Sequence, residues 1–214
     1  MNTTKKEIYL FDFDGTLVDS MPVYCNVMLG VLDEHGISYP DDIIKIITPL
    51  GLPKAVEYFI ALGIKRSAEE LAQLILSRVI NAYTNDVPAK PHVVDALRIL
   101  KARGASLNIL TASPHDTLDP CLKRIGIFDL FDNVWSCNDF ATSKADPAIY
   151  QMAAQRLGVA VDDVIFLDDN YNADKTAKEA GMTVYGVYDE SSKEFTEEIK
   201  AITDRYIFDF KELL

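Results

Sequence analysis

Two aspartates one residue apart, Asp12 and Asp14, follow the short apolar run Ile8–Phe11 and precede Gly15 and Thr16. Residues i and i+2 of an extended chain point to the same side, so the two carboxylates would lie close together. Like charges in one site are unfavourable unless a cation lies between them, and a set of oxygen ligands suits a hard divalent cation such as Mg²⁺. From this stretch alone, a solvated turn at the end of a strand would explain the pattern equally well.

A second polar group follows the apolar run Leu107–Leu110. It consists of Thr111, Ala112 and Ser113, and Pro114 comes directly after it. Proline is well suited to the first turn of a helix, and the exposed N–H groups at such a helix start, with the Thr111 hydroxyl, would make a phosphate-binding cradle. The alternative is that Thr111 and Ser113 only cap the helix.

Charged residues follow two further predicted strands. Asp168 and Asp169 come directly after the apolar stretch Val164–Leu167, and Lys144 lies in the loop after a predicted strand at 133–136. Ligands of open α/β sheets bind beyond the carboxyl ends of the strands, so these positions are candidates for a site. A solvated surface lysine is the alternative reading of Lys144.

Beyond Pro88, apolar runs and helical periodicities alternate along the chain. They predict strands at 7–11, 106–111, 133–136, 164–167, 183–187 and 206–208, and helices at 92–103, 115–125, 147–157 and 172–180. A capping box at Ser191–Glu194 predicts a last helix to about Ile202. Continuously apolar strands are typical of parallel sheets covered on both faces. The predicted fold class is therefore α/β, with a doubly wound, Rossmann-like parallel sheet.

Residues 20–87 show helical signals only, including a capping box at Ser67–Glu70. They separate the first predicted strand from the others. The chain is therefore expected to divide into an α/β core, formed by residues 1–19 and 88–214, and an inserted helical domain, formed by residues 20–87.

The composition excludes several classes of function. The 214 residues carry 21 Lys and Arg against 33 Asp and Glu, a net charge of -12, which argues against nucleic acid or an anionic membrane as a partner. The apolar run before Asp12 is too short for a signal peptide or a transmembrane helix. The three cysteines have no Cys-x-x-Cys spacing, which is typical of the reduced thiols of a cytoplasmic protein.

Taken in order, Asp-x-Asp-Gly-Thr, the strand ending in Thr111, then Lys144, then the strand followed by Asp168-Asp169 resemble the motifs of the haloacid dehalogenase-like superfamily. The helical insertion resembles the cap of the branch that contains phosphoglycolate phosphatase and beta-phosphoglucomutase. The resemblance implies an Mg²⁺-dependent phosphatase that acts through an aspartyl-phosphate intermediate.

The resemblance also implies a role for each residue. Asp12 would be the nucleophile, Asp14 the general acid and base, Thr111 a hydrogen-bond donor to the phosphoryl group, and Lys144 its charge balance. Mg²⁺ would be bound by the side chains of Asp12 and Asp169 and the carbonyl of Asp14, with Asp168 a weaker candidate.

The resemblance implies that the substrate is a small phosphorylated metabolite. The enzyme is expected to be a monomer or a weak dimer. Further candidates for contact with it are Gly15, Thr16, Ala112 and Ser113 in the core, and Lys54 and Tyr24 in the cap. Tyr24 is as well explained by packing within the cap, and Lys54 by the surface of a helix.

One departure concerns the metal. Relatives often carry an acidic residue four positions after the metal-binding aspartate, where this chain has Ala173, flanked by Asn172 and Asp174.

Three alternatives stay open at this point. A phosphosugar mutase would use the same groups but would shield the aspartyl-phosphate from water. A phospho-accepting signalling module, or a non-catalytic binding protein, would also carry such groups on a doubly wound sheet. Dehalogenation is disfavoured, because that branch of the superfamily needs neither the second aspartate nor a metal.

Overall fold

The computed structural model describes residues 6–214, with the side chain of residue 49 left out. The chain forms two compact units. Among the described residues, one consists of 6–19 and Pro88–Leu214, and the other of Ser20–Val87. Within residues 6–214, the structure contains no helix that combines the length and the apolar character needed to cross a membrane.

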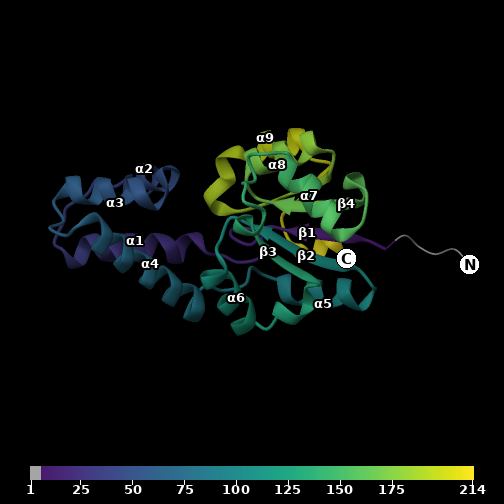
Figure 1. The fold of residues 1–214 in the computed structure, drawn as a ribbon, viewed down its shortest axis with the longest axis horizontal. Coiled ribbons are helices and arrows are strands. Elements are labelled where there is room, and N and C mark those ends of the chain that lie inside the picture. The colour runs from purple at the N-terminus through teal and green to yellow at the C-terminus, as the bar shows by residue number, and fades with distance from the viewer. Residues whose placement is uncertain (1–5) are drawn as a thin grey trace, which may run out of the picture. The chain divides into compact units, whose positions relative to one another are not determined.

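The first unit is built on a six-stranded sheet with the order β3-β2-β1-β4-β5-β6 (Figure 1). All neighbouring strands pair in parallel. Their bounds are β1 Ile8–Phe11, β2 Ser106–Thr111, β3 Asn133–Ser136, β4 Val164–Asp168, β5 Thr183–Val187 and β6 Arg205–Ile207. The predicted fold class, a Rossmann-like α/β fold with a doubly wound parallel sheet, is confirmed.

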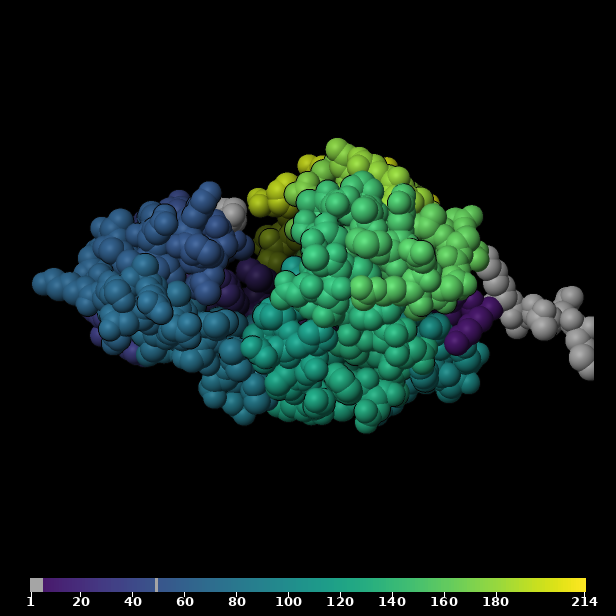
Figure 2. Space-filling view, viewed as in Figure 1, coloured from purple at the N-terminus to yellow at the C-terminus, as the bar shows by residue number. Residues whose placement is uncertain are grey.

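Helices cover both faces of this sheet. Helices α5 and α6 lie on one face, and α7, α8 and α9 lie on the other (Figure 1). In the space-filling view, teal residues, which include α5 and α6, gather on the lower part of this unit, and green to yellow residues, which include α7 and α8, gather on its upper part (Figure 2). The bounds are α5 Val93–Ala102, α6 His115–Arg124, α7 Ala148–Leu157, α8 Tyr171–Ala180 and α9 Thr196–Ile202. Short 3-10 helices span Phe128–Leu130, Cys137–Phe140, Val161–Asp163, Glu190–Phe195 and Phe210–Leu213.

The central strands are mostly apolar and mostly buried because helices cover them on both sides. All four residues of β1 and all six of β2 are buried. On the face covered by α7 and α8, Leu10 and Phe166 pack with Tyr150 and Ala177. The polar Asn108 is tolerated inside β2 because its amide donates hydrogen bonds to the Tyr9 carbonyl at 3.1 Å and to Ser106 Oγ at 3.2 Å.

The second unit contains only helices. Their bounds are α1 Met21–Glu34, α2 Ile43–Ile47, α3 Gly51–Leu62 and α4 Ala68–Asn85, with a 3-10 turn at Thr48–Leu50. The predicted capping box is confirmed: Ser67 Oγ accepts from the Glu70 N–H at 3.2 Å, and Glu70 Oε2 accepts from the Ser67 N–H at 3.0 Å. Buried apolar side chains, among them Met28, Phe59 and Leu71, form its own core.

One predicted helix start is wrong. The segment after β5 begins as the 3-10 helix Glu190–Phe195, and its cap is Asp189 rather than Ser191. Asp189 Oδ1 accepts hydrogen bonds from the Ser191 N–H at 2.9 Å and the Ser191 hydroxyl at 2.5 Å. A carboxylate is a stronger acceptor than a hydroxyl, so Ser191 donates to the cap instead of forming it.

Candidate active site

Asp12 lies at the carboxyl end of β1, and its N–H continues the sheet by donating to the Leu167 carbonyl at 2.8 Å. Its side chain is buried, whereas Asp14, two residues on, is half-buried. The intervening Phe13 is fully buried and anchors the loop in the core. At Gly15 the chain takes a positive φ of 74°, a conformation that glycine adopts without steric cost. The two carboxylates therefore leave the same strand end for different surroundings.

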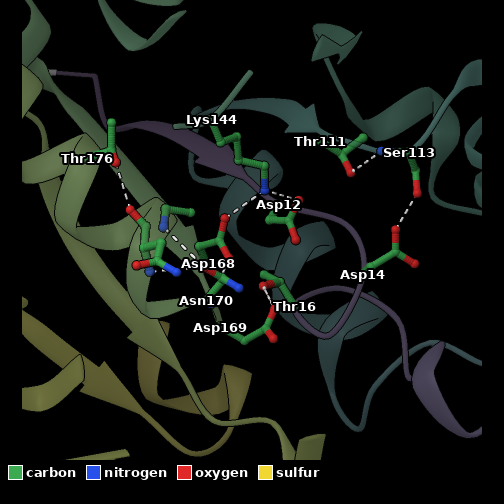
Figure 3. A network of polar contacts seen from close by, with 12 residues as sticks. Asp12, Asp14, Thr16, Thr111, Ser113, Lys144, Asp168, Asp169, Asn170 and Thr176 are labelled. Carbon is green, nitrogen blue, oxygen red and sulfur yellow. Dashed lines mark hydrogen bonds and ion pairs between the residues drawn. The ribbon is translucent and has the colours of Figure 1, made fainter. Parts of the chain in front are cut away.

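The end of β2 lies beside this loop, as expected from the strand order. Thr111 is buried, and its Oγ1 accepts from the Ser113 N–H at 3.1 Å. The Ser113 hydroxyl donates to Asp14 Oδ2 (Figure 3). Helix α6 is preceded by Pro114 at the cap position without a side-chain hydrogen bond, so the reading of Thr111 and Ser113 as helix caps is wrong. Ser113 instead holds the second aspartate of the first motif.

Lys144 reaches the centre of the site from the loop before α7. Its Nζ donates to Asp12 Oδ1 and to Asp168 Oδ2, the latter at 2.7 Å (Figure 3). Only 14% of its side chain is exposed, so the surface reading of this lysine is wrong. The Tyr150 hydroxyl, 3.1 Å from the Lys144 carbonyl oxygen, connects this loop to α7.

Asp168 is the last residue of β4 and Asp169 follows it, and both are buried. Both oxygens of Asp168 accept hydrogen bonds, Oδ2 from Lys144 and Oδ1 from the Asn170 N–H at 2.9 Å. Asp169 Oδ1 accepts from the Thr16 hydroxyl at 3.1 Å. Asp168 therefore anchors the lysine, while Asp169 is bound to the loop that follows Asp12.

A cavity of about 420 Å³ lies over these strand ends. Its lining includes most of the core residues that the sequence analysis selected: Asp12, Asp14, Thr111, Ala112, Lys144, Asp168 and Asp169. Among the described residues that line it, four carboxylates accompany a single ammonium group. Three further predicted residues do not line the cavity but contact residues that do. Gly15 and Thr16 contact Asp169, and Ser113 contacts Asp14.

Burial and mutual repulsion shift the ionisation of the site. Burial raises the pKa of Asp12 to about 6, although Lys144 acts against the rise. Burial, with the charges of Asp168 and Asp12, raises the pKa of Asp169 well above its ordinary value. For Lys144, burial acts to lower the pKa, but the charges of Asp12 and Asp168 raise it well above the ordinary range. The ammonium group of Lys144 therefore does not neutralise all of the carboxylates that surround it.

The residues present fit a divalent cation. Within residues 6–214, buried carboxylate oxygens of Asp12, Asp168 and Asp169 all lie within 4.8 Å of one another. An oxygen-only donor set of this kind suits Mg²⁺. Gly15 completes the fit, because a Cβ at this position would stand 2.6 Å from both Asp169 oxygens.

Asp174 is a buried acidic residue whose place the sequence left undecided. It lies in α8 and is completely buried, and neither of its carboxylate oxygens has a hydrogen-bond partner within the described part of the chain. Burial, followed by the charges of Asp168 and Asp169, raises its pKa well above the ordinary value. Asp174 is thus a buried carboxyl that the charges of Asp168 and Asp169 reach, but it is not among the carboxylates whose oxygens lie within 4.8 Å of one another.

Lys90 and Asp189 are two further residues near the site that the sequence analysis did not select. Lys90 Nζ donates to the Gly15 carbonyl at 2.5 Å and to Asp189 Oδ2 at 3.0 Å. A lysine between Pro88 and Pro91 reads as a loop residue, and an aspartate after a strand reads as a turn residue. The residue types around Lys90 and Asp189 do not predict this contact, because the two segments lie far apart in sequence.

His115 lies just past Ser113, in the first turn of α6. Its Nδ1 lies 2.8 Å from Asp119 Oδ1 and its Nε2 lies 3.0 Å from Asp139 Oδ2. Hydrogen bonds to Asp119 and then to Asp139 raise the pKa of His115. Both ring nitrogens thus contact carboxylates, and the contact with Asp139 joins α6 to the 3-10 turn after β3.

Lys54 and Tyr24, the candidates from the helical unit, have ordinary surroundings within that unit. Lys54 is exposed on α3. Tyr24 is half-buried on α1 and packs against the helical core, and burial raises the pKa of its hydroxyl. Their contact with substrate stays a prediction.

Comparison with known proteins agrees with this architecture. The family profile described as haloacid dehalogenase-like hydrolase matches residues 6–181. The chain is 28% identical over 186 residues to a phosphorylated carbohydrates phosphatase of Thermotoga maritima, covering 85% of each chain. It is 31% identical over 182 residues to the pyrophosphatase PpaX of Bacillus velezensis, covering 83% of this chain and 81% of the relative.

Solved structures extend the likeness to the whole fold. A crystal structure from Thermotoga maritima, provisionally assigned as a beta-phosphoglucomutase, superposes with a TM-score of 0.83 at 25% identity. The match covers 97% of this chain and 96% of the other. The two relatives are named as a phosphatase and a pyrophosphatase. The chain therefore belongs to the haloacid dehalogenase-like hydrolase family, and it is an enzyme.

Proposed function

We propose that this protein is an Mg²⁺-dependent phosphatase that hydrolyses a small phosphomonoester through an aspartyl-phosphate on Asp12. The observation that carries the proposal is the meeting of Asp12, Asp168 and Asp169 within 4.8 Å at the strand ends, with Lys144 bound to Asp12. Catalysis of phosphoryl transfer depends mainly on positioning and on neutralising the phosphoryl oxygens, and this site contains groups for both.

In the first step, an oxygen of Asp12 attacks phosphorus while the bond to the leaving alcohol breaks. Asp14, in its protonated form, gives its proton to the departing alkoxide. The Ser113 hydroxyl holds the Asp14 carboxyl at Oδ2, so the proton donor has a fixed orientation. The product is a mixed anhydride between the Asp12 carboxyl and phosphate, and the free alcohol leaves.

In the second step, Asp14 is a carboxylate and accepts a proton from water as that water attacks phosphorus. The anhydride bond breaks, inorganic phosphate leaves, and Asp12 returns to its starting form. Thr111, buried at the end of β2, donates to the phosphoryl group, and Lys144 offsets the charge of Asp12 and phosphate. Asp12 and Asp169, with the Asp14 carbonyl, would hold Mg²⁺, which supplies positive charge for the phosphoryl oxygens.

The test measures release of p-nitrophenol from p-nitrophenyl phosphate, with and without Mg²⁺. We expect Asp12→Asn to abolish turnover while the circular dichroism spectrum stays unchanged, because the amide is not a nucleophile. Asp162→Asn, in the short 3-10 turn before β4, is the matched control and should retain activity. Full activity of Asp12→Asn, or of the wild type in EDTA, would contradict the proposal.

A phosphosugar mutase is the second candidate, favoured by the likeness at 25% identity to the structure assigned as a beta-phosphoglucomutase. The two activities share the first step and differ in whether water or a second sugar hydroxyl takes the phosphoryl group. Product analysis with a hexose 1-phosphate separates them. Isomerised sugar phosphate without free phosphate would favour the mutase, and free phosphate would favour the phosphatase.

A further inference from the structure

The ammonium group of Lys90 is bound by acceptors from two separate loops of the α/β unit. It donates to the Gly15 carbonyl at 2.5 Å, to the Tyr188 carbonyl at 2.5 Å and to Asp189 Oδ2 at 3.0 Å. An ammonium has three N–H donors, so these three acceptors use all of them. Lys90 therefore joins the loop after β1 to the loop after β5.

Both members of the ion pair are held rigidly. The Lys90 N–H donates to the Leu17 carbonyl at 3.0 Å, and the neighbouring Ala89 forms an antiparallel bridge with Val18. Asp189 is fixed by its capping bonds to Ser191. The side chains of Lys90 and Asp189 are only 15% and 6% exposed, so water screens their interaction weakly.

The contact with Gly15 bears directly on the carboxylates of the site. Gly15 follows Asp14 in sequence, and its Cα faces Asp169 so closely that an added Cβ would stand 2.6 Å from both carboxylate oxygens. Thr16, the next residue, donates to Asp169 at 3.1 Å. A shift of the Gly15 peptide would therefore move the Asp14 carbonyl and Asp169 relative to each other.

We propose that Lys90, with Asp189 as its counter-charge, is a positioning residue that fixes the Gly15 peptide and thereby the geometry in which Asp12, Asp14 and Asp169 bind the divalent cation. Lys90 acts through Gly15 and touches neither substrate nor metal. The inference rests on the proposed function for its choice of ligand, Mg²⁺. Partners that orient metal ligands typically contribute about 10- to 100-fold to metal affinity.

The experiment measures Mg²⁺ binding to the full-length protein by isothermal titration calorimetry, which needs no turnover. We expect Lys90→Met to weaken Mg²⁺ binding by roughly 10-fold or more, and to lower the melting temperature because Asp189 is left buried and unpaired. The matched control is Lys178→Met. Lys178 Nζ lies 2.8 Å from both oxygens of Asp204, with side chains 33% and 43% exposed, and its loss should leave Mg²⁺ affinity unchanged.

A double variant separates positioning from stability. In Lys90→Met with Asp189→Asn, the unpaired buried charge is gone while the amide oxygen still caps the 3-10 helix, so the melting temperature should recover. Mg²⁺ affinity should stay low, because the Gly15 carbonyl still lacks its donor. In turnover assays, saturating Mg²⁺ should restore most of the kcat of both variants.

Unchanged Mg²⁺ affinity in Lys90→Met would overturn the inference, and so would affinity that recovers together with the melting temperature in the double variant. Failure of the proposed function would look different. A wild type that binds Mg²⁺ but hydrolyses no phosphate ester would refute the phosphatase, while the calorimetric comparison would still decide the role of Lys90.

Discussion

Gly15→Ala tests whether the loop after β1 must approach Asp169 as closely as the structure indicates. Gly126 offers an unusually matched control, because both glycines have φ of 74°. A Cβ on Gly126 would meet no atom within 4 Å, whereas a Cβ on Gly15 would stand 2.6 Å from the Asp169 oxygens and 2.7 Å from its Cγ. The two variants therefore share the backbone effect and differ in the contact with Asp169.

The shared backbone effect is modest. An alanine in the left-handed region costs about 1–2 kcal/mol, and the loss of unfolded-state freedom offsets about 0.4–1 kcal/mol of this. We expect Gly126→Ala to lose about 1 kcal/mol, which lowers the melting temperature of a chain of this size by about 2–4 °C. Its Mg²⁺ affinity should equal that of the wild type.

The additional effect in Gly15→Ala follows from the distance. An ordinary contact of 3.4 Å in place of 2.6 Å requires the Asp169 carboxylate and the loop to separate by about 0.8 Å. Asp169 is buried and bound by Thr16, so it has little room to move without losing that hydrogen bond. Displacements of about 1 Å in an active site can cost about 100-fold. We expect Mg²⁺ affinity and turnover to fall roughly 10- to 100-fold.

The assay combines thermal unfolding by circular dichroism with calorimetric titration of Mg²⁺ below the unfolding temperature. A Gly15→Ala variant that matched Gly126→Ala in both measurements would refute the reasoning, since the close approach to Asp169 would then have no consequence for the site.

Two other predictions concern buried and half-exposed charges. Lys144→Met should lower the free energy of unfolding in EDTA by about 3–5 kcal/mol, because Asp12 and Asp168 stay buried without their ammonium partner. Urea unfolding measures this, and Lys101→Met, whose ion pair is 32% and 38% exposed, should lose less than about 1 kcal/mol; equal losses would contradict the prediction. His115→Gln should lower the melting temperature more at pH 6 than at pH 9. The raised pKa of His115 means that its stabilisation is complete below its ordinary value of 6.5 and is lost as the pH rises through the folded value. A melting difference independent of pH would rule out this linkage.

The strand ends of the site were predictable because parallel strands covered on both faces are continuously apolar. The residue after each such run lies at the carboxyl edge, and Asp12, Thr111 and Asp168 lie there in the structure. The strand order also places β2, β1 and β4 side by side, so these residues become neighbours. Each apolar run in the sequence therefore locates one strand and its carboxyl end without reference to the other strands.

The supporting contacts were not predictable in the same way. The bonds from Ser113 to Asp14 and from Lys90 to Gly15 join residues 99 and 75 positions apart. Local propensity describes Ser113 as a helix cap and Lys90 as a loop residue, and both descriptions fit the sequence alone. Only the packing of the sheet decides which loops meet, and that packing depends on all of the strands together.

The charges of the site also imply an order of binding. Lys144 is already bound by Asp12 and Asp168, and Lys90 by Asp189, so neither ammonium is available at full strength for an anionic ester. The described lining of the cavity contains more carboxylates than cations. A phosphate entering alone would meet a negative potential in a weakly screened site. A divalent cation bound first reverses that potential locally, and we therefore expect phosphate esters to bind the metal-loaded form of the enzyme in preference to the metal-free form.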